Sequence, residues 1–478
     1  MINNFNKNII WSLISQFSNF GLSLIITIFL ARIILPQEYG LVDLALTVTA
    51  FFMIFADGGI VWSIVREKFI KNEEVVNLFW INTLLGLSLT LLCFFSSNYI
   101  SEFYNQPELN SILEWFSLIF LITGISTPYQ MWIKRKMEFK KLTLIQFFST
   151  FIGGGLALYF AYNNYGYWTL IILNLSKASL LLIFLFFFTD MPKGFYKLNI
   201  KIKHLIKFGL GLMGFSIVNY LARNLDNVLI GKYLGIEELA FYAKAYFLMF
   251  LPSTLSTGAL SGLMISILSK YQDDNKKFQL IYSKMLRAIF LITLPLTGYF
   301  LIFPQDPINL LYGPNWTGSI LLLQLLGIAT ITQPLYNTMG WTYTAVGKSK
   351  EMFKWGLFSS ALLSVSFIIG IQWGAEGIAM SYSITMGLFI FIYGLIKAHE
   401  ISNISFTKTF KMLIPVCIIG IISLSIIKSL DLFYFNFDSS LVSIFIKILL
   451  LLSLYIGLLY LYYRKKLIEI IDFRKIGN

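Results

Sequence analysis

The sequence has few charged residues, two histidines and two cysteines. Charged residues make up 13% of its 478 positions and hydrophobic residues 57%, whereas soluble domains carry about 25% charged residues. A soluble globular domain is therefore excluded. The two histidines are too few for most metal or proton-relay chemistry, and Cys93 and Cys417 lie in apolar runs where cysteine is a small hydrophobic residue. We expect no cofactor, no metal and no disulfide framework.

The apolar residues form long runs that are bounded by charges and by Gly, Pro or Asn. About 20 such residues cross the hydrocarbon core of a bilayer as a helix. The pattern predicts an all-α integral membrane protein with about fourteen transmembrane helices, at 8–32, 40–65, 77–99, 111–133, 142–162, 167–188, 207–231, 238–265, 282–303, 317–341, 353–373, 376–396, 410–430 and 441–463.

The basic residues behind the net charge of +13 lie mainly on one side of the predicted membrane spans. Of the 37 lysines and arginines, 30 fall on one side of the predicted spans, three fall on the other, and four lie within spans. Loops rich in Lys and Arg stay in the cytoplasm, so both termini are predicted to be cytoplasmic. Because the basic residues are scattered between spans, they form no soluble face for nucleic acid.

A weak internal repeat has an offset of 200 residues. Arg32 aligns with Lys232 and Glu38 with Glu238, at the ends of the first and seventh spans. Each half then holds six spans, an even number, which predicts parallel repeats about an axis along the membrane normal. The predicted organisation is an N-lobe at 1–190, a basic interfacial linker at 191–206, a C-lobe at 207–400, and two further helices with a basic tail at 401–478.

Ionisable side chains inside the spans are the candidate site residues, because charges in hydrocarbon are costly and usually face a cavity or each other. Lys177 lies near the middle of the sixth span, with Asn174 one turn before it. Arg223 and Asp226 have i,i+3 spacing in the seventh span, which also carries Asn219. These residues either line a solvated cavity or form an ion pair that only joins helices.

Other ionisable residues lie closer to span ends. Lys244 is a further candidate for the cavity, although a lysine this close to an end can also extend its amine to the interface. Asp43 and Asp57 are candidates for ion coupling. Asp57 precedes two glycines, so a helix-end role is the alternative for it.

Three segments carry a family resemblance: residues 31–40, residues 57–59 and, above all, residues 223–235, which read RNLDNVLIGKYLG. The chain resembles Wzx-type polysaccharide flippases, in the colanic-acid and teichuronic-acid exporter branch of the multidrug/oligosaccharidyl-lipid/polysaccharide (MOP) exporter superfamily. The resemblance covers essentially the whole chain.

The resemblance implies two six-helix lobes that form a V around a cavity, plus two C-terminal helices. It implies a flippase, not an enzyme, that moves an undecaprenyl-diphosphate-linked oligosaccharide across the bacterial inner membrane by alternating access. The product would be O-antigen, capsule or exopolysaccharide. Membrane lipids, a polysaccharide polymerase and a chain-length regulator are the other implied partners. A cationic cavity suits a diphosphate, because Lys and Arg make charge-assisted bonds to phosphate oxygens.

Three alternatives stay open. One is a structural or assembly membrane protein without transport, which the ionisable residues inside the spans disfavour. A MATE-like multidrug or cation antiporter would carry acidic coupling sites and bind cations, whereas the basic residues at mid-membrane favour an anionic substrate. A membrane-embedded glycan polymerase would need catalytic carboxylates on a large outer loop, and the predicted outer loops are short.

Overall fold

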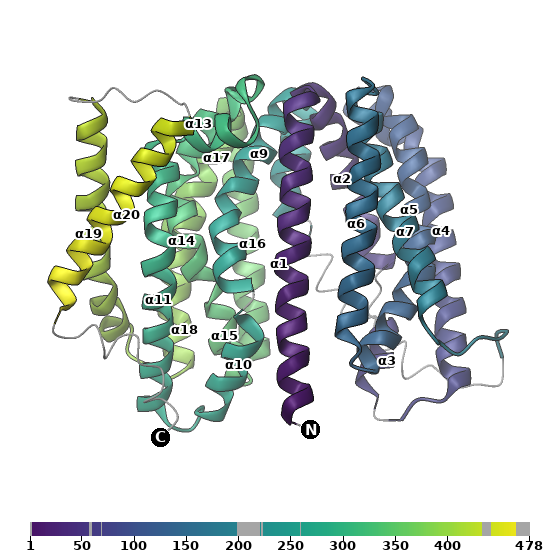
Figure 1. The fold of residues 1–478 in the computed structure, drawn as a ribbon, viewed down its shortest axis with the longest axis horizontal. Coiled ribbons are helices and arrows are strands. Elements are labelled where there is room, and N and C mark those ends of the chain that lie inside the picture. The colour runs from purple at the N-terminus through teal and green to yellow at the C-terminus, as the bar shows by residue number, and fades with distance from the viewer. Residues whose placement is uncertain are drawn as a thin grey trace. The chain divides into compact units, whose positions relative to one another are not determined.

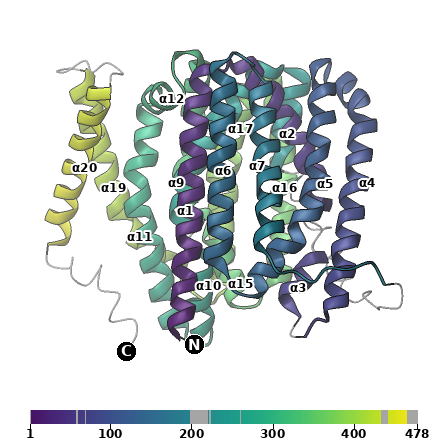
Figure 2. The ribbon, with the colours of Figure 1, turned by 45° about the vertical axis from the view of Figure 1, so that its right-hand side comes forward.

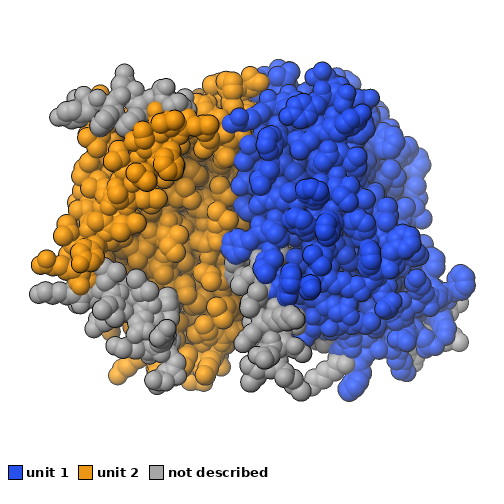
Figure 3. All heavy atoms as spheres, in the orientation of Figure 1, with its two compact units in different colours: residues 1–240 blue, residues 241–478 orange. Residues whose placement is uncertain are grey.

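The computed structural model describes residues 2–56, 60–67, 69–197, 220, 223–258, 260–432 and 441–464. Every regular element in this part of the chain is helical. The chain forms two compact units, residues 1–240 and 241–478 (Figure 3).

The first unit is a bundle of long helices. Helix α1 packs along α6, α6 packs on α7, and α4 pairs with α5 (Figure 1). The bounds are α1 Ile2–Ile33, α2 Pro36–Ala56, α3 Ser63–Arg66, α4 Asn72–Tyr104, α5 Glu108–Arg135, α6 Phe139–Tyr162 and α7 Trp168–Phe188.

Small residues allow α4 and α5 to touch backbone to backbone. A Cβ atom on Gly86 would lie 2.6 Å from the carbonyl oxygen of Phe120. At the same crossing the side-chain amide of Asn82 donates to the carbonyl of Gly124 over 2.9 Å. Close approach at small residues, supported by an interhelical hydrogen bond, is how helices associate in a bilayer, where apolar packing is not favoured over lipid.

Helix α9 (Ile236–Ser253) crosses the border between the units. In the second unit the last two helices pair with each other and also contact α11 (Figure 2). The bounds are α10 Ser261–Lys270, α11 Asn275–Ile302, α12 Gln305–Leu311, α13 Gly318–Leu325, α14 Gly327–Asn337, α15 Met339–Ala345, α16 Ser349–Gly370, α17 Gly374–Ile384, α18 Phe391–Ile401, α19 Phe406–Leu430 and α20 Leu441–Tyr463.

The described residues contain nine helices that are long and apolar enough to cross a membrane, or eleven if each of two bent pairs is one span. One of the nine, Ser349–Ile401, covers two predicted spans. Its α16 and α17 pack against each other after a turn at Gly374, whose φ of 72° suits glycine. The all-helical membrane architecture is confirmed. The count of fourteen stays a prediction, because most of span 207–231 lies outside the described residues.

The first unit extends beyond the predicted linker because residues of the seventh predicted span, and Lys232 just after it, contact α2 and α4. The hydroxyl of Tyr220 donates to the carbonyl of Thr47 on α2. The amine of Lys232 donates to the carbonyl of Phe103 at the end of α4 and lies 4.6 Å from the ring centre of Phe103. These contacts join segments from both predicted repeats. The lobe boundaries themselves remain a prediction.

The described start of the linker is fastened to α4. The side chain of Asn77, which is fully buried, makes two hydrogen bonds of 2.8 Å to the backbone of Lys197, one as donor and one as acceptor. The indole of Trp80 donates to the carbonyl of Gly194. Backbone polar groups of an irregular segment need such partners. The hydrogen bonds to α4 therefore hold the backbone of this segment in place as far as Lys197.

Candidate functional site

Lys177 lies at the middle of α7 and is exposed, although α7 is one of the most apolar of the described helices. Its backbone packs tightly on α6, since a Cβ on Gly153 would lie 3.1 Å from the Lys177 nitrogen. The ammonium makes no hydrogen bond or ion pair with any described residue. Asn174 is half-buried and donates to the carbonyl of Leu170 within its own helix over 2.8 Å. Lys177 therefore presents a positive charge on the surface of the first unit.

Arg223 and Asp226 lie on one helix but in different environments. The Arg223 side chain is exposed, whereas Asp226 is 1% exposed and its Oδ1 accepts from the backbone N–H of Asn227 over 2.9 Å. Within the part of the chain that the structure describes, these two residues do not pair with each other. The ion pair, one of the two alternatives that the spacing left open, is not formed between these residues, and Arg223 is, like Lys177, an exposed cation on a helix of the first unit.

Lys244 has a different setting from both. It lies on α9 in the second unit, is 7% exposed, and its amine lies 5.5 Å from the ring centre of Trp316. This geometry fits a cation–π contact. A hydrogen bond joins α13 to α9 in the same region, because the Ser319 hydroxyl donates to the carbonyl of Phe241 over 2.9 Å. The predicted role of Lys244 in the cavity stays a prediction.

The remaining candidates are less informative. Asn219 and Asp57 lie outside the described residues. Asp43 is half-buried on α2, and its backbone carbonyl accepts from the Thr47 hydroxyl over 2.9 Å. In the described ranges no group of three or more His, Cys, Asp or Glu residues could hold a metal ion.

The second unit contains a buried charge cluster that the sequence analysis did not predict. The Lys447 amine on α20 lies 2.5 Å from Asp306 Oδ2, and the same oxygen accepts from the Tyr299 hydroxyl over 2.5 Å. The Lys447 amine also lies 4.9 Å from the ring centre of Phe303. One signal was available: Lys447 lies inside an apolar span and needed an acidic partner. Asp306, however, is 141 positions away in the sequence.

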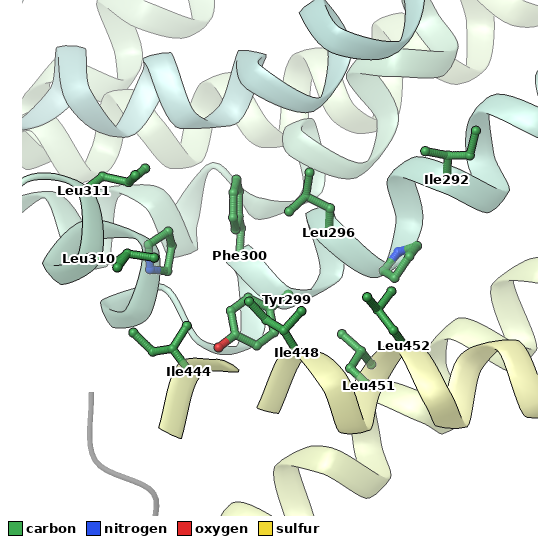
Figure 4. A pocket seen from close by; sticks show the side chains of 12 residues that line it. Ile292, Leu296, Tyr299, Phe300, Leu310, Leu311, Ile444, Ile448, Leu451 and Leu452 are labelled. Atoms are coloured by element: carbon green, nitrogen blue, oxygen red, sulfur yellow. The ribbon is translucent and has the colours of Figure 1, made fainter. Parts of the chain in front are cut away.

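An apolar pocket lies beside this cluster (Figure 4). It has a volume of about 310 Å³ and is lined by α11, α12 and α20, with Tyr299 as the one lining residue that has a polar side-chain atom. None of the predicted site residues lines it. Its chemistry suits hydrocarbon and not a sugar or a diphosphate.

Comparison with solved structures identifies the class of fold. The lipid II flippase MurJ in an inward closed conformation superposes with a TM-score of 0.76 at 17% identity, over 96% of this chain and 99% of that one. An inward-facing multidrug resistance MATE family transporter of the MOP superfamily gives 0.65 at 14% identity, over 82% and 99%. The chain therefore has the fold shared by these transporters.

Sequence comparison identifies the family. A model described as "polysaccharide biosynthesis protein" matches residues 29–321, which is more than half of the chain, and the chain belongs to this family. It is 26% identical to the lipopolysaccharide biosynthesis protein WzxC of Escherichia coli (strain K12), over 78% of this chain and 76% of that protein. It is 24% identical to the teichuronic acid biosynthesis protein TuaB of Bacillus subtilis (strain 168), over 68% of each. The resemblance inferred from residues 31–40, 57–59 and 223–235 is confirmed.

Proposed function

We propose that the chain is a flippase that moves an undecaprenyl-diphosphate-linked oligosaccharide across the bacterial inner membrane for surface polysaccharide biosynthesis. Three findings support this function. The family is that of polysaccharide biosynthesis proteins, the similar proteins include WzxC and TuaB, and the fold is shared with the lipid II flippase MurJ.

The observation that carries the proposal is the pair of exposed cations on the first unit. Lys177 and Arg223 lie on apolar spans and pair with no described residue. On insertion scales a charge at the centre of a membrane helix costs about 2.5–3.5 kcal/mol, and lipid offers it no compensation. A water-filled cavity with an anionic substrate offers both solvation and partners, because Lys and Arg bind phosphate oxygens.

The proposal assigns roles to the predicted site. Lys177 and Arg223 hold the diphosphate, and Asn174 binds the sugars. Asn219, which the sequence assigns to the same role, lies outside the described residues. Lys244 supplies a further charge. Asp43 and Asp57 are the residues to test for coupling to H⁺ or Na⁺.

The charge distribution of the loops supports a topology with both termini in the cytoplasm. The proposed protein has no catalytic step of its own. A polymerase and a chain-length regulator act on the glycan after it has crossed the membrane.

A MATE-like antiporter is the second candidate, and the shared fold favours it. The two candidates require opposite charge in the binding site. Cationic drugs would be repelled by Lys177 and Arg223, so the charge of these residues favours the glycan substrate over the drug substrate.

The experiment is depletion of the protein in its own host. We expect the lipid-linked oligosaccharide to accumulate on the cytoplasmic leaflet and surface glycan to fall, with both restored by the parent gene. Efflux of a cationic dye in the same cells tests the antiporter. Loss of dye efflux without accumulation of the lipid-linked oligosaccharide would overturn the flippase proposal.

A further inference from the structure

The outer ends of α2 and α9 meet within the first unit at positions that the repeat makes equivalent. Helix α2 begins at Pro36 and α9 at Ile236, an offset of 200 residues. One residue further along each helix, the Gln37 amide donates to the Glu237 carboxylate over 3.0 Å. Equivalent positions of two repeats can touch each other only close to the axis that relates the repeats. The contact therefore marks that axis at the end of the helices that the charge distribution assigns to the outside.

Gly40 sets how closely the two helices approach. A Cβ atom at this position would lie 1.8 Å from the carbonyl oxygen of Ile236, 2.6 Å from its carbonyl carbon and 3.3 Å from the Cβ of Ala240. Two of these three atoms belong to the backbone, so no side-chain rotation could make room. Any residue with a side chain at position 40 would hold the starts of α2 and α9 apart.

The polar part of this contact is accessible to solvent. Gln37 and Glu237 are both exposed, and exposed pairs of this kind add little to stability because water competes for both partners. The hydrogen bond between Gln37 and Glu237 can therefore form and break at little cost in free energy.

We propose that Gly40, Gln37 and Glu237 form an outer latch, which closes the external end between the two repeats and separates when the carrier releases its substrate. This inference rests on the proposed transport function. In a carrier made of two repeats, whatever joins the repeats at the outer end must part when the site opens outward. The amide–carboxylate bond holds the latch, and Gly40 makes closure possible.

The test uses a cysteine pair at Leu35→Cys and Leu234→Cys, beside the starts of the two helices, in a Cys93→Ala, Cys417→Ala background. The rate of oxidative cross-linking in isolated membranes reports how often the latch is closed. We expect the cross-linked protein to lose glycan export and to regain it after reduction. Full export with the cross-link complete would show a static contact and overturn the latch.

Exchange of the polar partners separates the latch from a general effect on folding. Gln37→Glu places two carboxylates opposite each other, and we expect cross-linking to slow by about fivefold, the equivalent of one lost hydrogen bond. Adding Glu237→Gln restores one donor and one acceptor with their positions reversed, and it should restore the parent rate. An unchanged rate in Gln37→Glu would mean that the bond does not hold the latch.

Gly40→Leu tests closure directly, and Gly155→Leu on α6 is its matched control, because a Cβ there meets no atom within 4 Å. We expect Gly40→Leu to abolish both cross-linking and export at normal protein abundance, while Gly155→Leu changes neither. Normal cross-linking in Gly40→Leu would overturn the proposal. Failure of the transport function is distinguishable, because cross-linking would still depend on Gly40 and Gln37 in a chain that exports no glycan.

Discussion

The amine of Lys447 and the carboxylate of Asp306 form an ion pair of 2.5 Å whose two side chains are each 1% exposed. The pair joins α20, the last helix of the described residues, to the short helix α12. Charges this deeply buried are stable only when each has a partner. The pair therefore fixes where α20 sits in the second unit.

Two further contacts hold α20 along α11. The hydroxyl of Tyr455 donates to the carbonyl of Leu291 over 3.2 Å, and the guanidinium of Arg287 lies 4.3 Å from the ring centre of Tyr463. Together with the Lys447 pair, these contacts occur near the start, in the middle and at the end of α20. The contacts therefore hold α20 against α11 and α12 along most of its length.

Loss of one partner of the buried pair should be costly. Lys447→Met leaves the Asp306 carboxylate without its counter-charge, and removing one partner of such a pair typically costs about 3–5 kcal/mol. We expect a lower thermal unfolding temperature in detergent and less protein in the membrane. Adding Asp306→Asn removes the remaining charge but keeps an acceptor for Tyr299, and it should recover most of the loss. No recovery in the double variant would argue that packing matters more than charge.

Lys428 provides a matched control for that measurement. Its amine also lies 4.9 Å from the ring centre of Phe303, but it is only half-buried. Lys428→Ala should cost no more than the about 0.5–1 kcal/mol of an accessible cation–π contact.

Lys177 should be required for transport and not for folding. Lys177→Ala is expected to reach the membrane at normal abundance and to lose most glycan export, because an exposed ammonium adds no packing. Lys177→Arg keeps the charge and should retain part of the export. Lys276→Ala, which removes an exposed lysine at the start of α11, should have no effect. Normal export from Lys177→Ala would remove this residue from the site.

Arg223 and Asp226 should act independently, because they do not pair. Arg223→Ala is expected to lose export at normal abundance. Asp226→Ala changes a buried side chain and should lower abundance, and combining it with Arg223→Ala should not restore the protein level. Immunoblots of membranes with parallel glycan assays separate the two effects. Rescue of abundance in the double variant would show that the two charges do compensate each other.

The topology can be tested with reporter fusions. Fusions after Lys140, Asn275 and Lys466 should report the cytoplasm, because loops rich in Lys and Arg remain inside. Fusions after Asn105, Asn164 and Asn315 should report the outside. An external signal at Asn275 would contradict both the orientation and the parallel repeat.

The sequence predicts features that depend on local composition. Apolar runs indicate the membrane helices, and the mid-span position of Lys177 is enough to make it a candidate site residue. Pairing depends on rotation and on tertiary packing. Three positions along a helix leave side chains about 60° apart, which is enough to expose Arg223 and bury Asp226. Likewise, nothing local to Asp306 indicates that a lysine 141 positions later will cover it.

The hydrogen bond between Gln37 and Glu237 also bears on how the two halves of the chain evolved. If the two halves arose by duplication of a six-helix ancestor that worked as a two-fold dimer, this position would have faced its own copy, as residues on the axis of an isologous interface do. Two identical glutamates there would repel each other, and two glutamines would lack charge. Fusion into one chain frees the copies to diverge, and an amide opposite a carboxylate is a combination that a symmetric dimer cannot encode.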